Sequence, residues 1–115
     1  MFDIEKYLLY EKEAPVQMDC LKASIPILKV LCDETRLSIL SLLSHNDMNG
    51  CEILKAFQCS QPTISYHMKL LVDAQLVRSR KEGCAVIYSI NSDIWPRIRD
   101  LLDVLCAAAK QKKGE

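Results

Sequence analysis

A short segment between Ser60 and Lys69 constrains the fold most, because it combines a helix start with a row of polar side chains. Ser60 is expected to cap a helix by accepting hydrogen bonds from the free N–H groups of the first turn. Pro62 falls in that turn, where its missing donor costs nothing. Apolar residues then recur at helical spacing and predict a buried stripe made of Ile64, Met68, Leu71 and Val72. The segment therefore predicts an amphipathic helix with a polar outer face.

The outer face of this helix carries side chains that can contact bases and phosphates in a DNA major groove. These side chains are Gln61, Thr63, Ser65, Tyr66, His67 and Lys69. We interpret His67 as a DNA contact rather than a metal ligand, because no second histidine is spaced to pair with it. The segment is therefore interpreted as the recognition helix of a DNA-binding domain.

The sequence on either side of this helix predicts a winged helix-turn-helix. Residues 51–57 suffice for two turns of helix, and a three- or four-residue break separates them from Ser60, as in a helix-turn-helix. Residues 76–81 and 85–90 alternate apolar and polar side chains around Glu82-Gly83, which predicts a hairpin, here a wing. Three basic residues of the wing are expected to contact phosphates: Arg78, Arg80 and Lys81.

Apolar spacing and caps predict further helices before the helix-turn-helix. Residues 3–13 are expected to form a short amphipathic helix appended to the core fold. Residues 18–32 form the next one, in which Pro26 must either kink the helix or lie in a first turn capped by Ser24. Asp33 is expected to cap a helix over residues 34–43. The inward-facing residues of that helix are expected to be Leu37, Leu40 and Leu43.

A long amphipathic helix is predicted to follow the wing, over residues 93–110, with Asn91 or Ser92 as its cap. Its apolar stripe consists of Ile94, Ile98, Leu101, Leu102 and Leu105. So long an apolar face on a small domain needs a partner, and a two-fold dimer would match the symmetry of palindromic DNA. Residues 45–50 have the composition of a loop.

Length and composition allow one compact domain in a chain of 115 residues. We expect an N-terminal extension at residues 1–16, the DNA-binding domain at 17–110 and a basic tail at 111–115. The sequence shows neither a signal peptide nor a membrane-spanning run, so we expect a cytoplasmic protein without a membrane partner. The net charge is zero, so bulk charge does not favour DNA binding, although basic residues gather in and after the recognition helix.

The sequences of four segments, taken together, resemble the ArsR/SmtB family of metal-responsive repressors, and within it the arsenical-resistance repressors. The segments are Leu31-Cys-Asp-Glu-Thr-Arg-Leu-Ser-Ile-Leu40, Phe57-Gln-Cys-Ser-Gln-Pro-Thr-Ile-Ser-Tyr-His-Met-Lys69, Leu76-Val-Arg-Ser-Arg-Lys-Glu-Gly83 and Val86-Ile-Tyr-Ser-Ile90. The resemblance implies a mainly α winged helix-turn-helix with a small β-hairpin, dimeric through its first and last helices. It also implies a homodimer that occupies operator DNA and leaves it when an inducer binds.

The cysteine pattern departs from this resemblance. The family motif Cys-x-Cys-Asp-Leu-Cys falls on Asn49-Gly-Cys-Glu-Ile-Leu54, so Cys51 alone is kept and a three-thiolate site within one helix is excluded. A thiol-based inducer site must therefore recruit cysteines from elsewhere among the six in the chain. The expected inducer is As(III) or Sb(III), which prefer thiolate ligands, and no cofactor is expected to be obligatory.

We expect the inducer ligands to be Cys20, Cys51 and Cys106. Antiparallel packing of residues 18–32 on residues 34–43 would place Cys20 near Cys51. Thiol-sensing relatives bring a cysteine at the position of Cys106 to the same region, so Cys106 could join the site from the same or the partner chain. Cys59 is excluded as a partner of Cys51, because the short helix between them separates the two by about 12 Å.

The same sequence leaves other functions open. The same thiols could respond to oxidation or persulfidation, or bind Cd(II) or Pb(II). Zinc or nickel sensing is disfavoured because the last helix contains no histidine. An enzyme is not expected, since the chain has no Cys-x-x-Cys pair and no phosphate-binding glycine loop. An interaction module that has lost DNA binding is disfavoured by the intact polar row from Gln61 to Lys69.

Overall fold

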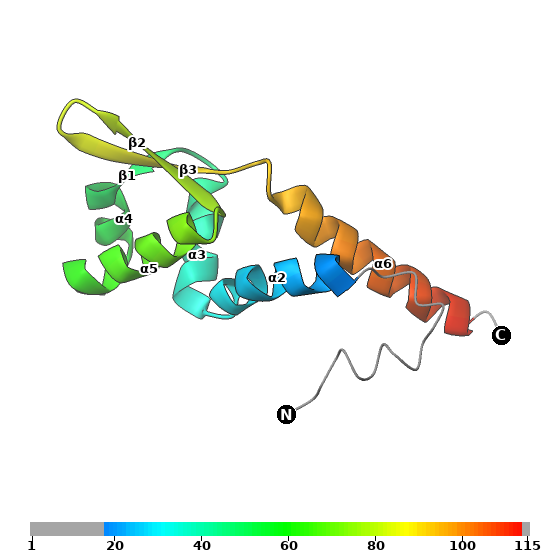
Figure 1. Ribbon diagram of the computed structural model, residues 1–115. Coiled ribbons are helices and arrows are strands. Elements are labelled where there is room, and N and C mark those ends of the chain that lie inside the picture. The colour runs from blue at the N-terminus through cyan, green and yellow to red at the C-terminus, as the bar shows by residue number, and fades with distance from the viewer. Residues whose placement is uncertain (1–17, 114–115) are drawn as a thin grey trace.

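The computed structural model describes the backbone of residues 18–113 and the side chains of residues 21–107. Helices and a small antiparallel sheet alternate in the order of a winged helix-turn-helix (Figure 1). The elements are α2 (Met18–Leu31), α3 (Glu34–Leu43), β1 (Met48–Asn49), α4 (Gly50–Ala56), α5 (Gln61–Asp73), β2 (Val77–Glu82), β3 (Ala85–Ile90) and α6 (Trp95–Lys113). The helix predicted over residues 3–13 and the tail at 114–115 lie outside the described residues.

The core of the domain lies between α3, α4, α5 and the base of the wing. Ile39, Ile53 and Leu71 are completely buried there, one from each of the three helices. On α5 the apolar stripe predicted from the sequence is confirmed, with Ile64 and Met68 also buried and Val72 packed against them. Burial of these side chains is worth roughly 1.5–3 kcal/mol each, which fixes the rotation of α5 about its axis.

Local hydrogen bonds define both helices of the helix-turn-helix. Ser60 caps α5 as predicted, with its Oγ 3.3 Å from the Thr63 backbone nitrogen. At the start of α4, Asn49 and Glu52 form a capping box: Asn49 Oδ1 accepts from the Glu52 N–H at 2.8 Å, and Glu52 Oε1 accepts from the Asn49 N–H at 3.0 Å. The box starts α4 at Gly50, one residue earlier than predicted.

The sheet has a third strand that the sequence did not indicate. The hairpin of β2 and β3 is confirmed, with Glu82 opposite Ala85, so that the turn consists of Gly83 and Cys84. Gly83 has a φ of +63°, a conformation that favours glycine. The predicted loop at residues 45–50 instead contains β1, which pairs with β3 through Met48 opposite Tyr88. The wing is therefore tied to the chain segment that begins α4.

Two expectations for α3 have different outcomes. Asp33 caps the helix as predicted, since its Oδ1 accepts from the Arg36 backbone N–H at 3.0 Å. The prediction that Leu37 faces inward was wrong, because 52% of its surface is exposed. Ile39 takes its place in the core beside Leu40 and Leu43.

The flanking helices also refine the predictions. Pro26 lies inside α2, well beyond its first turn, so a first turn capped by Ser24 is excluded. The last helix begins at Trp95 rather than near Asp93, and neither predicted cap stands next to its first residue. Asn91 is buried and joins the two ends of the wing instead: its Nδ2 donates to the Gln75 carbonyl at 2.7 Å. Among the described helices, none combines the length and apolarity needed to cross a bilayer.

The turn from the recognition helix into the wing is a Schellman motif. The Gln75 N–H donates to the Val72 carbonyl at 2.9 Å, and the Leu76 N–H donates to the Leu71 carbonyl at 3.0 Å. Gln75 supplies the left-handed residue of this motif, with a φ of +64°, where glycine is usual. The motif sets the direction in which β2 leaves α5.

The cap at Asp33 predicts a pH-dependent contribution to stability. The hydrogen bond from the Arg36 N–H lowers the pKa of Asp33 below 3.8. The stabilisation is therefore complete above the unfolded pKa and is lost as the pH falls through the lowered native value. Asp33→Ala should reduce the free energy of unfolding by about 1 kcal/mol at neutral pH, measured by urea denaturation. The difference in the free energy of unfolding between Asp33→Ala and wild type should shrink below about pH 4. Asp33→Asn should retain most of the stabilisation by the cap both at neutral pH and below about pH 4.

Candidate nucleic-acid interface

The outer face of α5 is exposed along its length. The burial of Ile64, Met68 and Leu71 turns the opposite side of the helix to solvent. Exposed on that side are the predicted contact residues Gln61, Thr63, Ser65, Tyr66 and Lys69. Tyr66 is the most notable, because an aromatic side chain that is 59% exposed has few apolar neighbours. Thr63 differs in that its hydroxyl lies 2.9 Å from the Ser60 hydroxyl and so belongs to the cap as well.

His67 lies apart from the exposed row. Its side chain is half-buried, and its Nδ1 is 3.1 Å from Nη1 of Arg36 on α3. The neighbouring Tyr66 ring is tilted against the imidazole, with 5.7 Å between ring centroids. The structure thus gives His67 a partner inside the protein that the sequence did not suggest.

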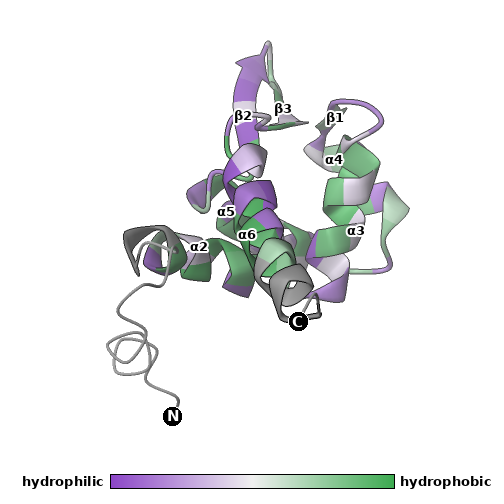
Figure 2. Ribbon diagram, turned by 90° about the vertical axis from the view of Figure 1, so that its right-hand side faces the viewer, coloured by the Kyte–Doolittle hydropathy of each residue, from purple (hydrophilic) through white to green (hydrophobic). Residues whose placement is uncertain are grey.

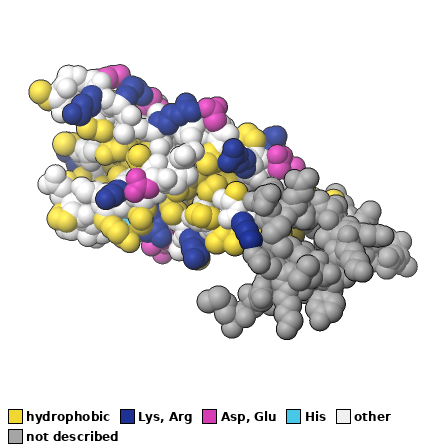
Figure 3. Space-filling view, in the orientation of Figure 1, with side chains coloured by type: hydrophobic (Ala, Val, Ile, Leu, Met, Phe, Trp, Pro, Cys, Tyr) yellow, Lys and Arg dark blue, Asp and Glu magenta, His cyan; other side chains and the backbone are white. Residues whose placement is uncertain are grey.

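The predicted phosphate contacts on the wing are accompanied by acids. Nη1 of Arg80 lies 3.0 Å from Asp47 in the loop before β1, and its Nε lies 2.9 Å from Glu82. Hydrogen bonds to Glu82 and Asp47 raise the pKa of the guanidinium. Arg78 is paired with Asp93, whereas Lys81 is exposed near the wing tip. Figure 3 shows basic and acidic side chains together along the upper edge of the molecule, over the wing.

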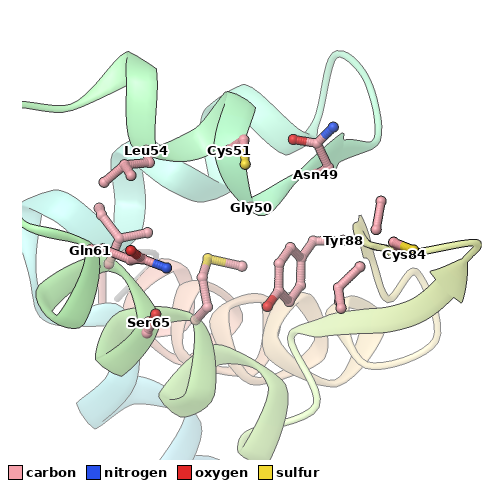
Figure 4. A pocket seen from close by; sticks show the side chains of 12 residues that line it. Asn49, Gly50, Cys51, Leu54, Gln61, Ser65, Cys84 and Tyr88 are labelled. Atoms are coloured by element: carbon pink, nitrogen blue, oxygen red, sulfur yellow. The ribbon is translucent and has the colours of Figure 1, made fainter.

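A cleft of about 540 Å³ lies between α4, the recognition helix and the wing. Figure 4 shows Gln61 and Ser65 on one wall, Cys51 on α4, and Cys84 and Tyr88 from the wing. Cys51 and Cys84 are both free thiols with exposed side chains. In this view Cys51 lies on the α4 side of the cleft, and Cys84 lies at the turn of the wing. The walls of the cleft include residues that were predicted to contact DNA.

The three predicted inducer ligands are not brought together within one chain. Cys51 is in the first turn of α4, and Cys106 is in the C-terminal half of α6, at the other end of the molecule (Figure 1). Both are exposed, whereas the side chain of Cys20 lies outside the described residues. No group of three or more His, Cys, Asp or Glu side chains able to hold a metal ion occurs in the described part of the chain.

The premise that placed Cys20 near Cys51 does not hold for a single chain. Figure 1 shows α2 extending from the start of α3 toward α6 instead of lying antiparallel along α3. Its neighbour in the fold is therefore the last helix. A site shared by Cys20, Cys51 and Cys106 would have to form between two chains.

Comparison with known proteins decides the family. Residues 33–79 match the sequence profile described as bacterial regulatory protein, arsR family. The arsenical resistance operon repressor of Staphylococcus xylosus is 45% identical over 95 residues, covering 77% of this chain and 91% of the relative. The chain belongs to the ArsR family of bacterial regulatory proteins. It is thus a DNA-binding transcription regulator and not an enzyme.

Solved structures agree with the fold. An ArsR-like transcriptional regulator from Rhodococcus sp. RHA1 superimposes with a TM-score of 0.79 over 86% of this chain and 91% of its own, at 21% identity. The homodimeric winged helix-turn-helix DNA-binding domain of a possible ArsR-family regulator from Mycobacterium bovis has a TM-score of 0.64 at 25% identity, covering 83% of this chain and 88% of its own. The winged helix-turn-helix predicted from the sequence is confirmed.

The pairing of Arg80 with Asp47 predicts that removing the acid increases DNA affinity. Asp47→Asn should remove one of the two carboxylate partners of the guanidinium and steepen the salt dependence of binding to random duplex DNA. Exposed ion pairs contribute up to about 1 kcal/mol, so the gain in affinity should be at most about fivefold. Fluorescence anisotropy over a salt series measures both effects. Asp100→Asn makes the same charge change on α6, and an equal gain there would show that net charge alone is responsible.

Proposed function

We propose that the protein is a homodimeric transcriptional repressor that occupies operator DNA and leaves it when a thiophilic inducer binds. The proposed inducer class is trivalent arsenic or antimony. The observation that carries the proposal is the exposed polar face of a capped, firmly anchored α5 beside the wing. Operator DNA lies in the cytoplasm, and the repressor acts there.

The contacts with DNA divide between α5 and the wing. Side chains on the exposed face of α5 enter the major groove and read base edges: Gln61, Thr63, Ser65 and Tyr66. Cations at the edge of this surface contact phosphates: Lys69, Arg78, Arg80 and Lys81. Both wing arginines must exchange a carboxylate partner for a phosphate, which lowers the net gain from each contact.

Exposed apolar side chains on α2 and α6 support dimer formation. On α2 these are Ile25 and Leu28, and on α6 they are Leu102, Val104 and Leu105, with between 37% and 57% of each surface exposed. Figure 2 shows hydrophobic residues on both helices. A second copy of the chain would cover this surface, and the two-fold axis would place two recognition helices at successive major grooves.

The inducer site is proposed at Cys51, with Cys20 and Cys106 contributing across the dimer. Relatives named for arsenical resistance support an arsenic-type inducer, and soft metalloid ions select thiolates. Cys51 borders the cleft that also contains Gln61 and Ser65. An inducer bound there would favour an arrangement of α4 and α5 that fits DNA less well, and its differential affinity for the two states would drive release.

Alanine substitutions should separate base reading from phosphate contact. Gln61→Ala should reduce the preference for the operator over random DNA by about one order of magnitude, as expected for loss of a bidentate base contact. Arg80→Ala should weaken binding to both DNAs by a similar factor and flatten the salt slope by about one unit. Equal effects of the two substitutions on both DNAs would contradict this division of roles.

Serine substitutions should locate the inducer site. In gel shifts under reducing conditions, Cys51→Ser should raise the arsenite concentration needed for half-release by at least about tenfold, because a charge-bearing soft ligand is lost. Cys20→Ser and Cys106→Ser should act in the same direction, and Cys32→Ser serves as the control. A normal response of Cys51→Ser would exclude this site.

A second candidate function keeps the DNA-binding role, but the signal that releases the protein from DNA is different. Exposed free thiols at Cys51, Cys84 and Cys106 favour oxidation or persulfidation as the switch, and the same thiols can bind Cd(II) or Pb(II). Peroxide or polysulfide that lowers operator affinity in the absence of arsenite would support this signal. Operator affinity that responds to arsenite alone would exclude it.

A further inference from the structure

The guanidinium of Arg36 joins three helices, one of which is the recognition helix. The side chain of Arg36 on α3 is 12% exposed. Its Nε donates to the Val30 carbonyl of α2 at 2.6 Å, and its Nη1 lies 3.1 Å from His67 Nδ1 on α5. The same Nη1 is 3.9 Å from Asp33, the cap of α3. Arg36 therefore contacts the end of one helix, the start of its own helix and the middle of the recognition helix.

The contact with Val30 completes the C-terminus of α2. The last carbonyls of a helix have no partner within the helix. Here the Leu28 carbonyl accepts from the Cys32 N–H at 3.1 Å, and the Leu31 carbonyl accepts from the Asp33 N–H at 2.8 Å. The Val30 carbonyl receives the charged Nε of Arg36, and a cation at this end is also favoured by the helix dipole. The position of Arg36 is thus set by α2.

The contact with His67 fixes the chemical state of the imidazole. A guanidinium has donors only, so Nδ1 must be the acceptor and cannot carry a proton. The neutral ring then holds its proton on Nε2. A proton added to Nδ1 would remove the hydrogen bond and place a cation against Arg36. The contact therefore requires Nδ1 to be the unprotonated ring nitrogen.

We propose that Arg36 is a positioning residue for the recognition helix, acting through the neutral Nδ1 of His67, and that His67 holds α5 instead of reading a base. The inference rests on the DNA-binding role proposed above. It assigns His67 to the inner side of α5, in keeping with its half-buried side chain next to Met68. Rotation of α5 about its axis is then held by a directional hydrogen bond as well as by its apolar stripe.

The same contacts connect the dimer surface to DNA binding. Val30 is in the last turn of α2, the helix that packs against α6 and carries part of the exposed apolar surface. A shift of α2 on dimer assembly or inducer binding would move the Val30 carbonyl, which positions Arg36. Arg36 would then shift its hydrogen bond to His67 on α5. The link makes operator binding depend on the hydrogen bond between Arg36 and His67.

A matched pair of substitutions distinguishes holding from reading. The side-chain oxygen of Asn lies close to the position of Nδ1 in histidine, and that of Gln lies close to Nε2. At about pH 7.5, His67→Asn should bind the selected operator nearly as well as wild type, whereas His67→Gln should lose about tenfold, the equivalent of one charge-assisted hydrogen bond. The opposite order would show that Nε2 contacts DNA and would overturn the proposal. Urea denaturation of wild type, His67→Asn and His67→Gln checks that the variants remain folded.

A measurement without DNA separates this inference from the proposed function. Nitrogen-15 NMR of the imidazole in the free protein should show Nδ1 unprotonated and Nε2 protonated at neutral pH. Amide exchange should accelerate in α5 of Arg36→Met more than in α4. A proton on Nδ1, or unchanged exchange in α5, would overturn the positioning role. Failure of wild type to bind any DNA would refute the repressor instead, and these spectra would still decide the role of Arg36.

Discussion

Burial of one face of α5 is the constraint on which the rest of the molecule depends. Ile64, Met68 and Leu71 enter the core formed with α3 and α4, and this leaves the helix only one orientation. The polar row is exposed because its apolar counterpart is buried, and the Schellman turn at Gln75 then sets where the wing begins. The proposed DNA-binding surface therefore follows from packing on the opposite side of the helix.

Features with a local cause were predictable from the sequence. The caps at Ser60 and Asp33, the stripe on α5 and the wing hairpin all depend on residues within a few positions of one another. The capping box of Asn49 and Glu52 carried the same kind of signal, an Asn followed three residues later by Glu, although the segment was assigned to a loop. Spacing alone could not show that Leu37 is exposed, because that depends on which neighbours α3 meets.

Features that join distant segments were not predictable in the same way. Asp47 and Arg80 are far apart in the sequence, as are Arg36 and His67, yet each pair is in contact. Counting basic residues on the wing therefore overstated the charge available to DNA. The predicted thiol cluster also depended on contacts between distant segments, because its prediction assumed antiparallel packing of α2 on α3, which the structure does not show. The local parts of the candidate site, its cap and its exposed polar row, could be predicted from the sequence, whereas its long-range connections needed the fold.

The short strand β1 gives the wing a mechanical role beyond supplying cations. Asn49 is paired with Ile87 in the sheet and is also the cap of α4, and Cys51 follows two residues later. Sheet, cap and thiol thus share one stretch of backbone. A displacement of this stretch would act directly on β3, the central strand of the sheet, through the pairing of Asn49 with Ile87. The backbone that carries Cys51 is therefore connected to the wing through β1.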